Sequence, residues 1–332
     1  MPSLLAAPDK FRGTASAAQA AGAMAAAARA AGWDAVTMPV SDGGEGLLDC
    51  IGGANRTTTV DGPLGEPVEA EWRLDGTRAV IEMATASGLA LVRGRNDPLA
   101  ASTRGTGQLV RTAIDCGART VIVGAGGSAS TDGGWPAVEV LRGYAPLDGS
   151  RRARVIVASD VRTSFVDAAA VFAPQKGADH EQVRMLTDRL ERLAERYQHE
   201  FGVPVRALAG AGAAGGLAGG LAALGATIRP GFQLVAEQLE LPRAVAAADL
   251  VVTGEGRLDP TSLQGKATGS LVQLCERQGV PVAVIAGQIA AEFRPPFRAA
   301  ELVKICGADR ARYETLTCIR EATAGLLAGN RP

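Results

Sequence analysis

Short aliphatic runs that end in polar, glycine-containing loops constrain the fold of this chain more than any other feature. Each run is rich in Val, Ile, Leu or Ala and stops at Gly, Asp, Ser or Thr. The runs lie at 3–9, 35–44, 119–128, 154–160, 249–256 and 280–288. Alanine-rich stretches of helical character separate several of them. This alternation predicts an α/β fold, with a mainly parallel, Rossmann-like α/β/α sheet that carries helices on its faces.

Two helices have clear start signals. Ser16 and Gln19 have the spacing of a capping box ahead of an alanine run, and Asp179 and Gln182 repeat that spacing at the start of 179–201. The apolar residues of the second helix recur every three or four positions. They are Val183, Leu186, Leu190, Leu193, Tyr197 and Phe201. We expect this stripe to face a hydrophobic core.

Residues 56 to 83 show a different β pattern, in which two strand-like runs meet at Asp75-Gly76 as in an antiparallel hairpin. At 332 residues the chain is long enough for two domains. The change of pattern predicts a Rossmann-like domain of residues 1–60 plus 230–332 and an inserted α+β domain of residues 61–229.

Composition excludes several partners. A formal net charge of −1 gives no electrostatic footprint for nucleic acid, and it leaves a homodimer open. The five cysteines form no C-x-x-C pair, which is typical of reduced thiols in a cytoplasmic protein. The uncharged segment 207–228 is long enough for a bilayer, but it is largely glycine and alanine. We therefore expect a glycine-rich loop that opens a buried helix, and no membrane partner.

Lysine is rare here, which makes its positions informative. Of 34 basic residues only four are lysine: Lys10, Lys176, Lys266 and Lys304. A lysine ammonium is a compact point charge, so lysines kept in so arginine-biased a chain are candidates for contact with phosphate. Lys304, in the strand-like run LVKIC, is expected at a strand end. The other three lie in loops that carry Gly or Asp.

The polar loops fall where ligands bind in open α/β sheets, at the carboxyl ends of strands. Asp9 follows the first run, and Ser41, Asp42 and Glu45 follow the second; Asp42 and Glu45 also have capping-box spacing. Asp160 ends another run, where a carboxylate can accept a proton from a hydroxyl or hold a metal ion.

The run GAGGSASTDGG, residues 124–134, places glycines around Ser128, Thr131 and Asp132, where free N–H groups can hold an anion. A tight strand-to-helix turn is an equally good interpretation of each residue. The segment is not a nucleophile elbow, because Ser130 stands where that motif needs glycine.

Two further glycine-rich stretches resemble nucleotide motifs only in part. In GAGAAGG (210–216) the acid expected about 20 residues on, Glu237, lies in a helical-looking run. We interpret the stretch as a helix N-terminus that binds phosphate, without a case for NAD. The stretch 251–266 ends in Gly-Lys, but Pro260 and Ala267 exclude a P-loop.

Other chemistries lack their parts. The only histidines, His180 and His199, lie off the apolar stripe of the 179–201 helix, so a His-based triad or a zinc site is not expected. The remaining glycine loops, carboxylates and isolated lysines are the inventory of phosphoryl transfer.

Eight blocks of the sequence together resemble the glycerate kinase family, type I, the glycerate 2-kinases. They are APDKFRGTASA, VSDGGEG, RGTGQL, GGSASTDGG, FAPQKGA, GAGAAGGL, TGEGRLDPTSLQGKA and VIAG, in that family's order, from Ala7 to Gly287. The resemblance implies an ATP- and Mg²⁺-dependent kinase of D-glycerate, usually at the 2-hydroxyl. It also implies an α/β domain with a second domain inserted and an active site in the interdomain cleft.

The resulting hypothesis gives each candidate residue a role. Asp160, Lys10, Arg12 and Lys266 are catalytic, with Asp160 as base or magnesium ligand and Glu255 as a second ligand. The expected acceptor-binding residues are Asp9, Ser41, Asp42, Glu45, Ser128, Thr131, Asp132, Gln175 and Lys176. The expected nucleotide-binding residues are Gly126, Gly127, Gly210, Gly212, Gly215, Gly216, Glu255 and Asp259.

Departures from the family keep alternatives open. Residues 135–153 are shorter than in the family, and after Ser159-Asp160-Val161 this chain has RTSFVDAAA in place of an Asn-Pro-Leu segment. The acceptor or its phosphorylated hydroxyl can differ, as in a glycerate 3-kinase or a kinase of a related small hydroxy acid. A nicotinamide-dependent oxidoreductase and a non-catalytic metabolite sensor on a kinase fold are the rival classes.

Overall fold

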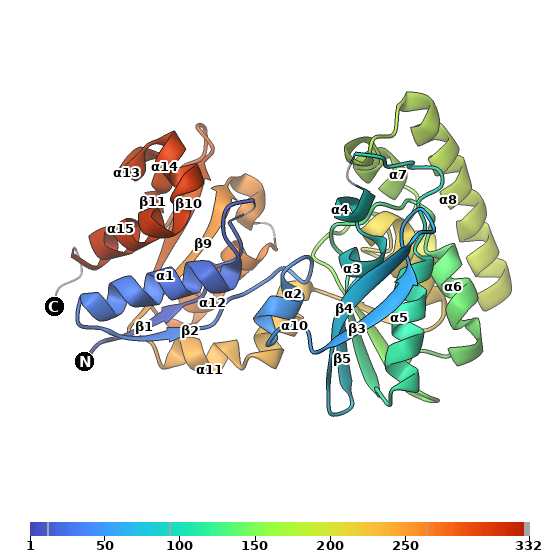
Figure 1. Ribbon diagram of the computed structural model, residues 1–332, viewed down its shortest axis with the longest axis horizontal. Coiled ribbons are helices and arrows are strands. Elements are labelled where there is room, and N and C mark those ends of the chain that lie inside the picture. The colour runs from blue at the N-terminus through green and yellow to red at the C-terminus, as the bar shows by residue number, and fades with distance from the viewer. Residues whose placement is uncertain (12, 93, 264, 329–332) are drawn as a thin grey trace. The chain divides into compact units, whose positions relative to one another are not determined.

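The computed structural model describes residues 1–11, 13–92, 94–263 and 265–328 (Figure 1). Contacts divide the chain into two compact units. The first comprises residues 1–42, 49–51 and 232–332, and the second comprises residues 43–48 and 52–231. The chain therefore forms a two-domain α/β fold. The sequence predicts an inserted domain of residues 61–229. Whether that segment folds independently is not tested by these contacts, so its boundaries remain a prediction.

The first unit is built on a five-stranded parallel sheet. In spatial order its strands are β2 (Asp34–Thr37), β1 (Ser3–Ala6), β9 (Leu250–Leu258), β10 (Val282–Ile289) and β11 (Arg298–Glu301). This is the 2-1-3-4-5 order of doubly wound sheets, in which the strand order reverses beside the first strand. The reversal lies between β1 and β9.

Alternate residues of these strands face helices on opposite sides of the sheet. Leu4 and Ala6 are buried in one cluster with α1 (Ala17–Ala30) and α15 (Thr315–Ala328). Leu5 faces the other cluster, which contains residues of α10 (Gly231–Gln238), α11 (Leu241–Ala246) and α12 (Ala267–Gln278). Helices thus cover both faces, as the sequence predicts.

Local sequence signals explain one helix here and fail at another. The capping box of Ser16 and Gln19 forms at the start of α1. The run LVKIC is not a strand: it is the helix α13 (Leu302–Cys306), in which Lys304 pairs with Glu301 at 2.7 Å, three residues earlier. Such a short apolar run is compatible with a strand or a helix. The ion pair between residues three positions apart has the spacing of neighbours on a helix. The helix α14 (Ala308–Tyr313) follows, and α2 (Leu47–Cys50) lies earlier in the chain.

The second unit contains a mixed six-stranded sheet. Its strands, in spatial and chain order, are β3 (Arg56–Asp61), β4 (Pro67–Asp75), β5 (Arg78–Glu82), β6 (Thr120–Gly124), β7 (Arg154–Ala158) and β8 (Thr227–Arg229). The pairs β3–β4 and β4–β5 are antiparallel, with Gly76 at a positive φ of 55° in the tight turn, and the remaining pairs are parallel. The predicted hairpin is confirmed.

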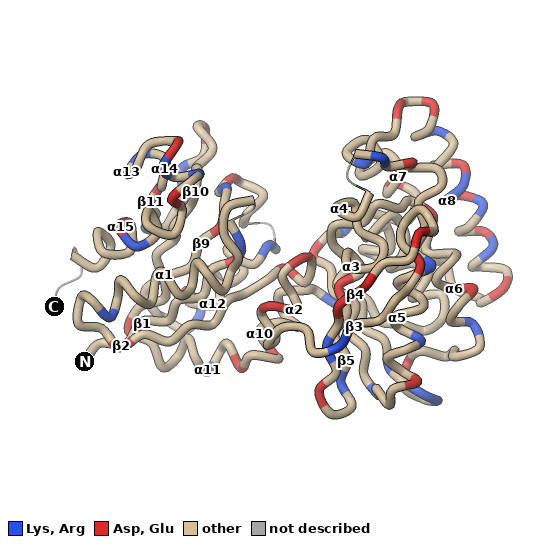
Figure 2. The backbone as a smooth tube through the Cα atoms, viewed as in Figure 1, with Lys and Arg blue, Asp and Glu red and all other residues tan. Residues whose placement is uncertain are grey.

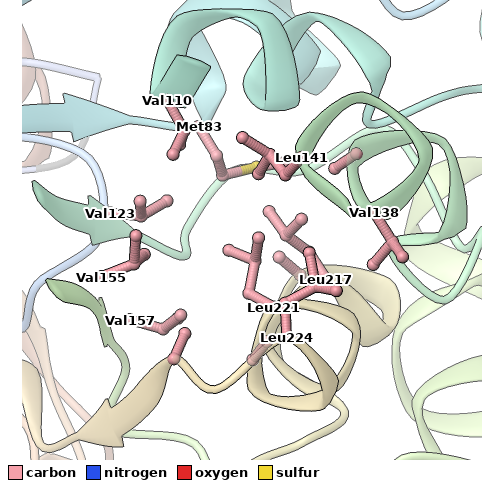
Figure 3. Close-up of a cluster of buried hydrophobic side chains, with 14 of the residues drawn as sticks. Met83, Val110, Val123, Val138, Leu141, Val155, Val157, Leu217, Leu221 and Leu224 are labelled. Carbon is pink, nitrogen blue, oxygen red and sulfur yellow. The ribbon is translucent and has the colours of Figure 1, made fainter. Parts of the chain in front are cut away.

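Apolar side chains of the parallel strands β6 and β7 pack against a layer of helices (Figure 3). The layer includes α5 (Arg104–Asp115), α6 (Trp135–Leu141) and α9 (Leu217–Ala223). The shorter helices of the unit are α3 (Ala84–Ser87), α4 (Leu89–Val92) and α7 (Ala168–Phe172). Figure 3 shows the valines of both strands directed toward the leucines of α9.

The longest helix, α8 (His180–Phe201), begins with the predicted capping box of Asp179 and Gln182. Leu186, Leu190 and Tyr197 are buried in the same core cluster, and the other apolar residues of the stripe pack against it. The amphipathic pattern therefore gave the correct inward face.

Residues 210–224, the middle of the glycine-rich segment 207–228, are buried inside the second unit. They form the 3₁₀ turn η4 (Ala213–Gly216) and the short helix α9. In the part of the chain that the structure describes, no helix is long and apolar enough to cross a membrane. A Cβ on Gly212 would lie 2.2 Å from the backbone oxygen of Ser164, so packing alone requires glycine there.

Two glycine-to-alanine variants should separate packing from propensity. Gly212→Ala should lower the free energy of unfolding by about 2–3 kcal/mol, because a backbone atom blocks the new methyl. Gly22→Ala, in the middle of α1 where a Cβ meets no described atom within 4 Å, should raise it by about 0.5–1 kcal/mol. Urea denaturation measures both. Equal changes in the two variants would contradict the packing argument.

Candidate functional site

The first unit gathers carboxylates at the point where its strand order reverses. Asp9 follows β1, and its backbone N–H donates to the carbonyl of Gly254 in β9 at 2.8 Å. Glu255 is the residue after Gly254. On the other side of Gly254, Thr253 Oγ1 donates to the carbonyl of Ala7 at 2.8 Å. These bonds hold the carboxyl ends of β1 and β9 side by side, where open α/β sheets bind ligands.

Burial makes the charge of Asp9 expensive. The pKa of Asp9 is raised to about 7, chiefly by burial and also by the carboxylates of Asp42 and Glu255, whereas the backbone N–H and the charge of Lys10 act to lower it. The N–H of Lys10 donates to Asp9 Oδ1 at 2.7 Å. A cation bound beside Asp9 would therefore be stabilised.

One carboxylate oxygen of Glu255 is an unsatisfied hydrogen-bond acceptor. Its Oε1 is buried and has no hydrogen-bond partner among the described residues, and the same holds for Thr268 Oγ1. Burial raises the pKa of Glu255, while the nearby hydroxyls of Thr268 and Ser262 and the charge of Lys266 lower it. The hydroxyl of Thr268 is close enough to act on Glu255 but lacks the geometry of a hydrogen bond. A buried carboxylate oxygen of this kind suits a metal ion or a donor from a ligand.

The stretch after β9 is a turn built by Asp259. Asp259 Oδ1 accepts hydrogen bonds from Thr261 N at 2.8 Å and Thr261 Oγ1 at 2.6 Å, and these bonds lower its pKa. The turn η5 (Pro260–Leu263) follows, and Lys266 Nζ donates to Thr261 Oγ1 at 2.9 Å. Lys266 is the last residue before α12, so its charge lies beside a helix N-terminus.

In the second unit, the glycine loop 43–46 lies across the carboxyl ends of the parallel strands. A Cβ on Gly43 would lie 2.6 Å from Gly231 Cα, and one on Gly126 would lie 2.7 Å from Gly44 Cα. Backbone thus touches backbone at both places, which only glycine allows. Asp160, after β7, accepts a hydrogen bond from Gly231 N at 2.9 Å through Oδ1.

Glu82 is a residue of this edge that the sequence reasoning missed. It ends β5, and its Oε1 accepts hydrogen bonds from Gly46 N at 2.9 Å and Leu48 N at 2.8 Å. The signal was present, because Glu82 is a carboxylate at the end of a predicted strand. Its role is to hold the 43–48 loop.

Glu45 lies directly on the next glycine loop. A Cβ on Gly127, whose φ is +67°, would lie 2.3 Å from Glu45 Oε1. An anion at this backbone would meet the carboxylate of Glu45 unless a cation stood between them. Gly127 is exposed, as a ligand-binding loop requires.

Lys176 is inside the second unit, not on a loop surface. Its Nζ donates to Ser128 Oγ at 2.8 Å, to the carbonyl of Ser130 and to Thr131 Oγ1 at 3.5 Å. Burial lowers the pKa of Lys176 to about 8, and the charge of Asp132 opposes that shift. The ammonium therefore holds the 124–134 loop in place through hydrogen bonds from the interior of the unit.

Asp132 is also committed to internal bonds. Its Oδ2 accepts hydrogen bonds from Thr103 N at 2.7 Å and Thr103 Oγ1 at 2.9 Å, and its Oδ1 accepts one from Gly134 N at 3.0 Å. Gln175, next to Lys176 in the turn η2 (Pro174–Lys176), is exposed.

The remaining glycines of GAGAAGG pack like Gly212. A Cβ would lie 2.9 Å from Val161 O at Gly210, 2.1 Å from Ser130 O at Gly215 and 2.7 Å from Gly133 Cα at Gly216. All three glycines are buried. Close packing within the unit accounts for each glycine, and the phosphate-binding role assigned to them stays a prediction.

The predicted residues thus form three sets. Those of the first unit are Asp9, Lys10, Ser41, Asp42, Glu255, Asp259 and Lys266, and Arg12 lies outside the described residues. Those at the strand ends and loops of the second unit are Glu45, Gly126, Gly127, Ser128 and Asp160. The others of that unit, apart from Gln175, are buried inside it, and their predicted ligand-binding roles stay predictions. Within the described ranges, no three His, Cys, Asp or Glu residues gather in the manner of a metal site.

The two lysines should differ in their effect on stability. Lys176→Met leaves the buried partners of the ammonium unsatisfied, so it should lower the free energy of unfolding by about 2 kcal/mol or more. Lys266→Met, on a partly exposed turn, should lower it by less than about 1 kcal/mol. Chemical denaturation decides, and similar losses would contradict the internal role of Lys176.

Asp9 should make stability depend on pH. Its folded-state pKa of about 7 lies above the ordinary 3.8, so ionisation costs folding free energy as the pH rises between these values. Asp9→Asn cannot ionise. It should match the wild type near pH 4 and be more stable above pH 7, by up to about 4 kcal/mol at about 1.4 kcal/mol per pKa unit. A difference that stays constant from pH 4 to pH 8 would contradict the shift.

Comparison with known proteins gives the same result from sequence and from structure. The model of the Glycerate kinase family matches residues 4–152 and 147–328. A protein named glycerate kinase from Halalkalibacterium halodurans is 38% identical over 335 residues, with 90% of this chain and 88% of its own covered. Glycerate 2-kinase of Escherichia coli K12 is 37% identical over 321 residues, with 85% and 84% covered.

A solved structure, described as that of a proposed glycerate kinase 2 from Salmonella typhimurium LT2, aligns with a TM-score of 0.80 and 32% identity over 99% of both chains. Both sequence blocks and fold therefore agree over nearly the whole length. The chain belongs to the glycerate kinase family and is a kinase, a phosphotransferase whose acceptor is an alcohol group.

Proposed function

We propose that this protein transfers the γ-phosphoryl group of ATP to D-glycerate, at the 2-hydroxyl. The named relatives support glycerate and ATP as substrates, and the relative from Escherichia coli K12 is named a glycerate 2-kinase. The observation that carries the proposal is the set of Asp9, Lys10 and Glu255 at the strand-order reversal of the first unit. Phosphoryl transfer depends on positioning and charge neutralisation. This set supplies a positive ammonium for phosphate or carboxylate groups and negative carboxylates for a metal ion.

Lys266 is proposed to bind a phosphate group. A positive side chain beside the N-terminus of α12 adds to the positive end of the helix dipole, which destabilises the free protein slightly. An anion at that place is attracted by the ammonium and by the helix end together. This arrangement explains why Gly-Lys ends the stretch although it is not a P-loop.

Glu255 is proposed as a magnesium ligand. The buried, unpaired Oε1 of Glu255 fits a cation, and Mg²⁺ in kinases is commonly held by one or two carboxylates plus phosphate oxygens and water. When bound, the ion would neutralise charge on the phosphates. A cage of three protein ligands is not required.

Asp160 is proposed as the group that accepts the proton of the substrate hydroxyl. The N–H of Gly231 fixes its Oδ1, which sets the orientation of the carboxylate. Lys10 and Arg12 are proposed to bind the glycerate carboxylate or the transferring phosphoryl group. Ser41 and Asp42 are proposed to contact the acceptor as well.

The alternatives have less support. The oxidoreductase hypothesis depends on GAGAAGG, whose glycines are buried by packing against their own unit. A glycerate 3-kinase, or a kinase of a related hydroxy acid, is a change of the acceptor pocket, where residues 162–170 depart from the family. A non-catalytic sensor predicts binding without turnover.

Product analysis tests the proposal directly. The purified protein with Mg²⁺, ATP and D-glycerate should form ADP and 2-phosphoglycerate, with the phosphate position read by ³¹P NMR. Formation of 3-phosphoglycerate would keep the kinase and contradict the 2-hydroxyl. ATP loss only with another hydroxy acid would contradict glycerate, and no ATP loss with any acceptor would leave the sensor.

Two variants test the assigned roles in the same assay. Asp160→Asn should lower kcat by about 100-fold or more, in the range usual for a general base. Lys266→Ala should lower kcat/KM for ATP by a similar factor. The matched control is Lys304→Ala, another lysine of the first unit with a 79% exposed side chain, which should change neither value more than twofold. Equal effects of the two lysine variants would contradict the role of Lys266.

A further inference from the structure

The second unit has a cavity of about 530 Å³ that the proposed reaction does not use. It is bounded by one face of α8, the first residues of α6 and the loop 99–102. The side chains that define its character are Leu99, Ser102, Trp135, Arg189, Arg192 and Arg196. Its volume is that of a site for a small organic ligand.

The charge pattern of α8 is sorted by face. The three arginines of the wall recur at intervals of three and four residues, which places them on one side of the helix. An acidic residue immediately precedes each arginine, and none of the three acids lines the cavity. They are Asp188, Glu191 and Glu195. Figure 2 shows the alternation of basic and acidic residues along α8.

The arginines differ in what already holds them. Arg189 Nη1 donates to the carbonyl of Leu99 at 2.9 Å. Arg196 pairs with Glu200 at 2.6 Å and stacks 3.6 Å over the ring of Trp135. Arg192 makes no hydrogen bond or ion pair with any residue that the structure describes. Arg192 is exposed, so its guanidinium donors are accessible to a ligand, while its neighbours are held in place.

One negative charge also reaches the cavity, and it is compensated. Asp132 lines the floor, but its two oxygens accept hydrogen bonds from Thr103 and Gly134, and the ammonium of Lys176 acts on it electrostatically. The apolar part of the wall comes from Leu99, Leu193 and Pro136. The cavity thus combines a cationic side with an apolar side.

We propose that this cavity binds a small organic phosphate, with its dianionic group on Arg192 and Arg189 and its apolar part against Leu99, Leu193 and the edge of Trp135. Arginine forks match phosphate oxygens in a bidentate manner, and a phosphate dianion balances the excess positive charge. Of the residues that the sequence assigned to the reaction, Asp132 alone is among those that line the cavity, and the existence of the site does not depend on that function.

The competing explanation is a solvated charged face of an amphipathic helix, and phenyl phosphate distinguishes the two. This probe joins a dianion to a ring and is neither ATP nor a hydroxy acid. Isothermal titration calorimetry at fixed ionic strength should give saturable binding to the wild-type protein. Arg192→Ala should weaken it about 10-fold or more, because charge-assisted hydrogen bonds are lost.

Arg184→Ala is the matched control, since it removes the same charge from the same helix without touching the cavity. It should change the affinity for phenyl phosphate less than twofold. Inorganic phosphate, which lacks the ring, should bind at least about 10-fold more weakly than phenyl phosphate. Absence of saturable binding, equal effects of the two variants, or equal affinity for the two probes would overturn the proposal.

Discussion

Direct contact between backbone segments is the constraint on which the second unit depends. At Gly43, Gly126, Gly212 and Gly215 a single methyl group would collide with main-chain atoms of a neighbouring loop. Backbone atoms cannot move aside as side chains can, so these loops fit together in one arrangement only. That arrangement fixes Asp160 through Gly231 and brings Glu45 onto the loop that contains Gly127.

Two buried ionisable groups show how the fold handles charge near its candidate sites. Asp9 is buried near other carboxylates, and both burial and these charges raise its pKa. A bound cation would lower that pKa again. Lys176 instead finds acceptors inside the protein, and its ammonium becomes part of the structure of the 124–134 loop. One group is suited to a ligand and the other to internal support.

Regular elements were predictable where one local pattern determined them. The capping boxes of α1 and α8, the apolar stripe of α8 and the antiparallel strands after residue 56 are all confirmed. The strand predicted for LVKIC was wrong, because five residues carry too little periodicity to distinguish a strand from a helix. The family, and with it the kinase activity, followed from eight blocks in order, each of them weak alone.

Side-chain roles were less accessible from the sequence, because they depend on segments far apart in the chain. Lys176 looks like a loop charge until Ser128 and Ser130 are found around it, and the sequence does not show the neighbouring carbonyls that leave room only for glycine in GAGAAGG. Glu82 was overlooked although it ends a predicted strand, because its partners are backbone N–H groups of Gly46 and Leu48, which no sequence motif marks.

The order of strands in the first unit also dictates when its sheet can close during synthesis. β1 pairs with β9, and Ser3 N donates to Asp249 Oδ2 across a separation of 246 residues. At ordinary rates of translation β1 waits roughly 10–50 s for that partner, whereas the six strands of the second unit follow one another along the chain. β1 can pair early with β2, but its other edge stays open until β9 has been made, so its apolar residues must stay out of wrong pairings while the second unit folds.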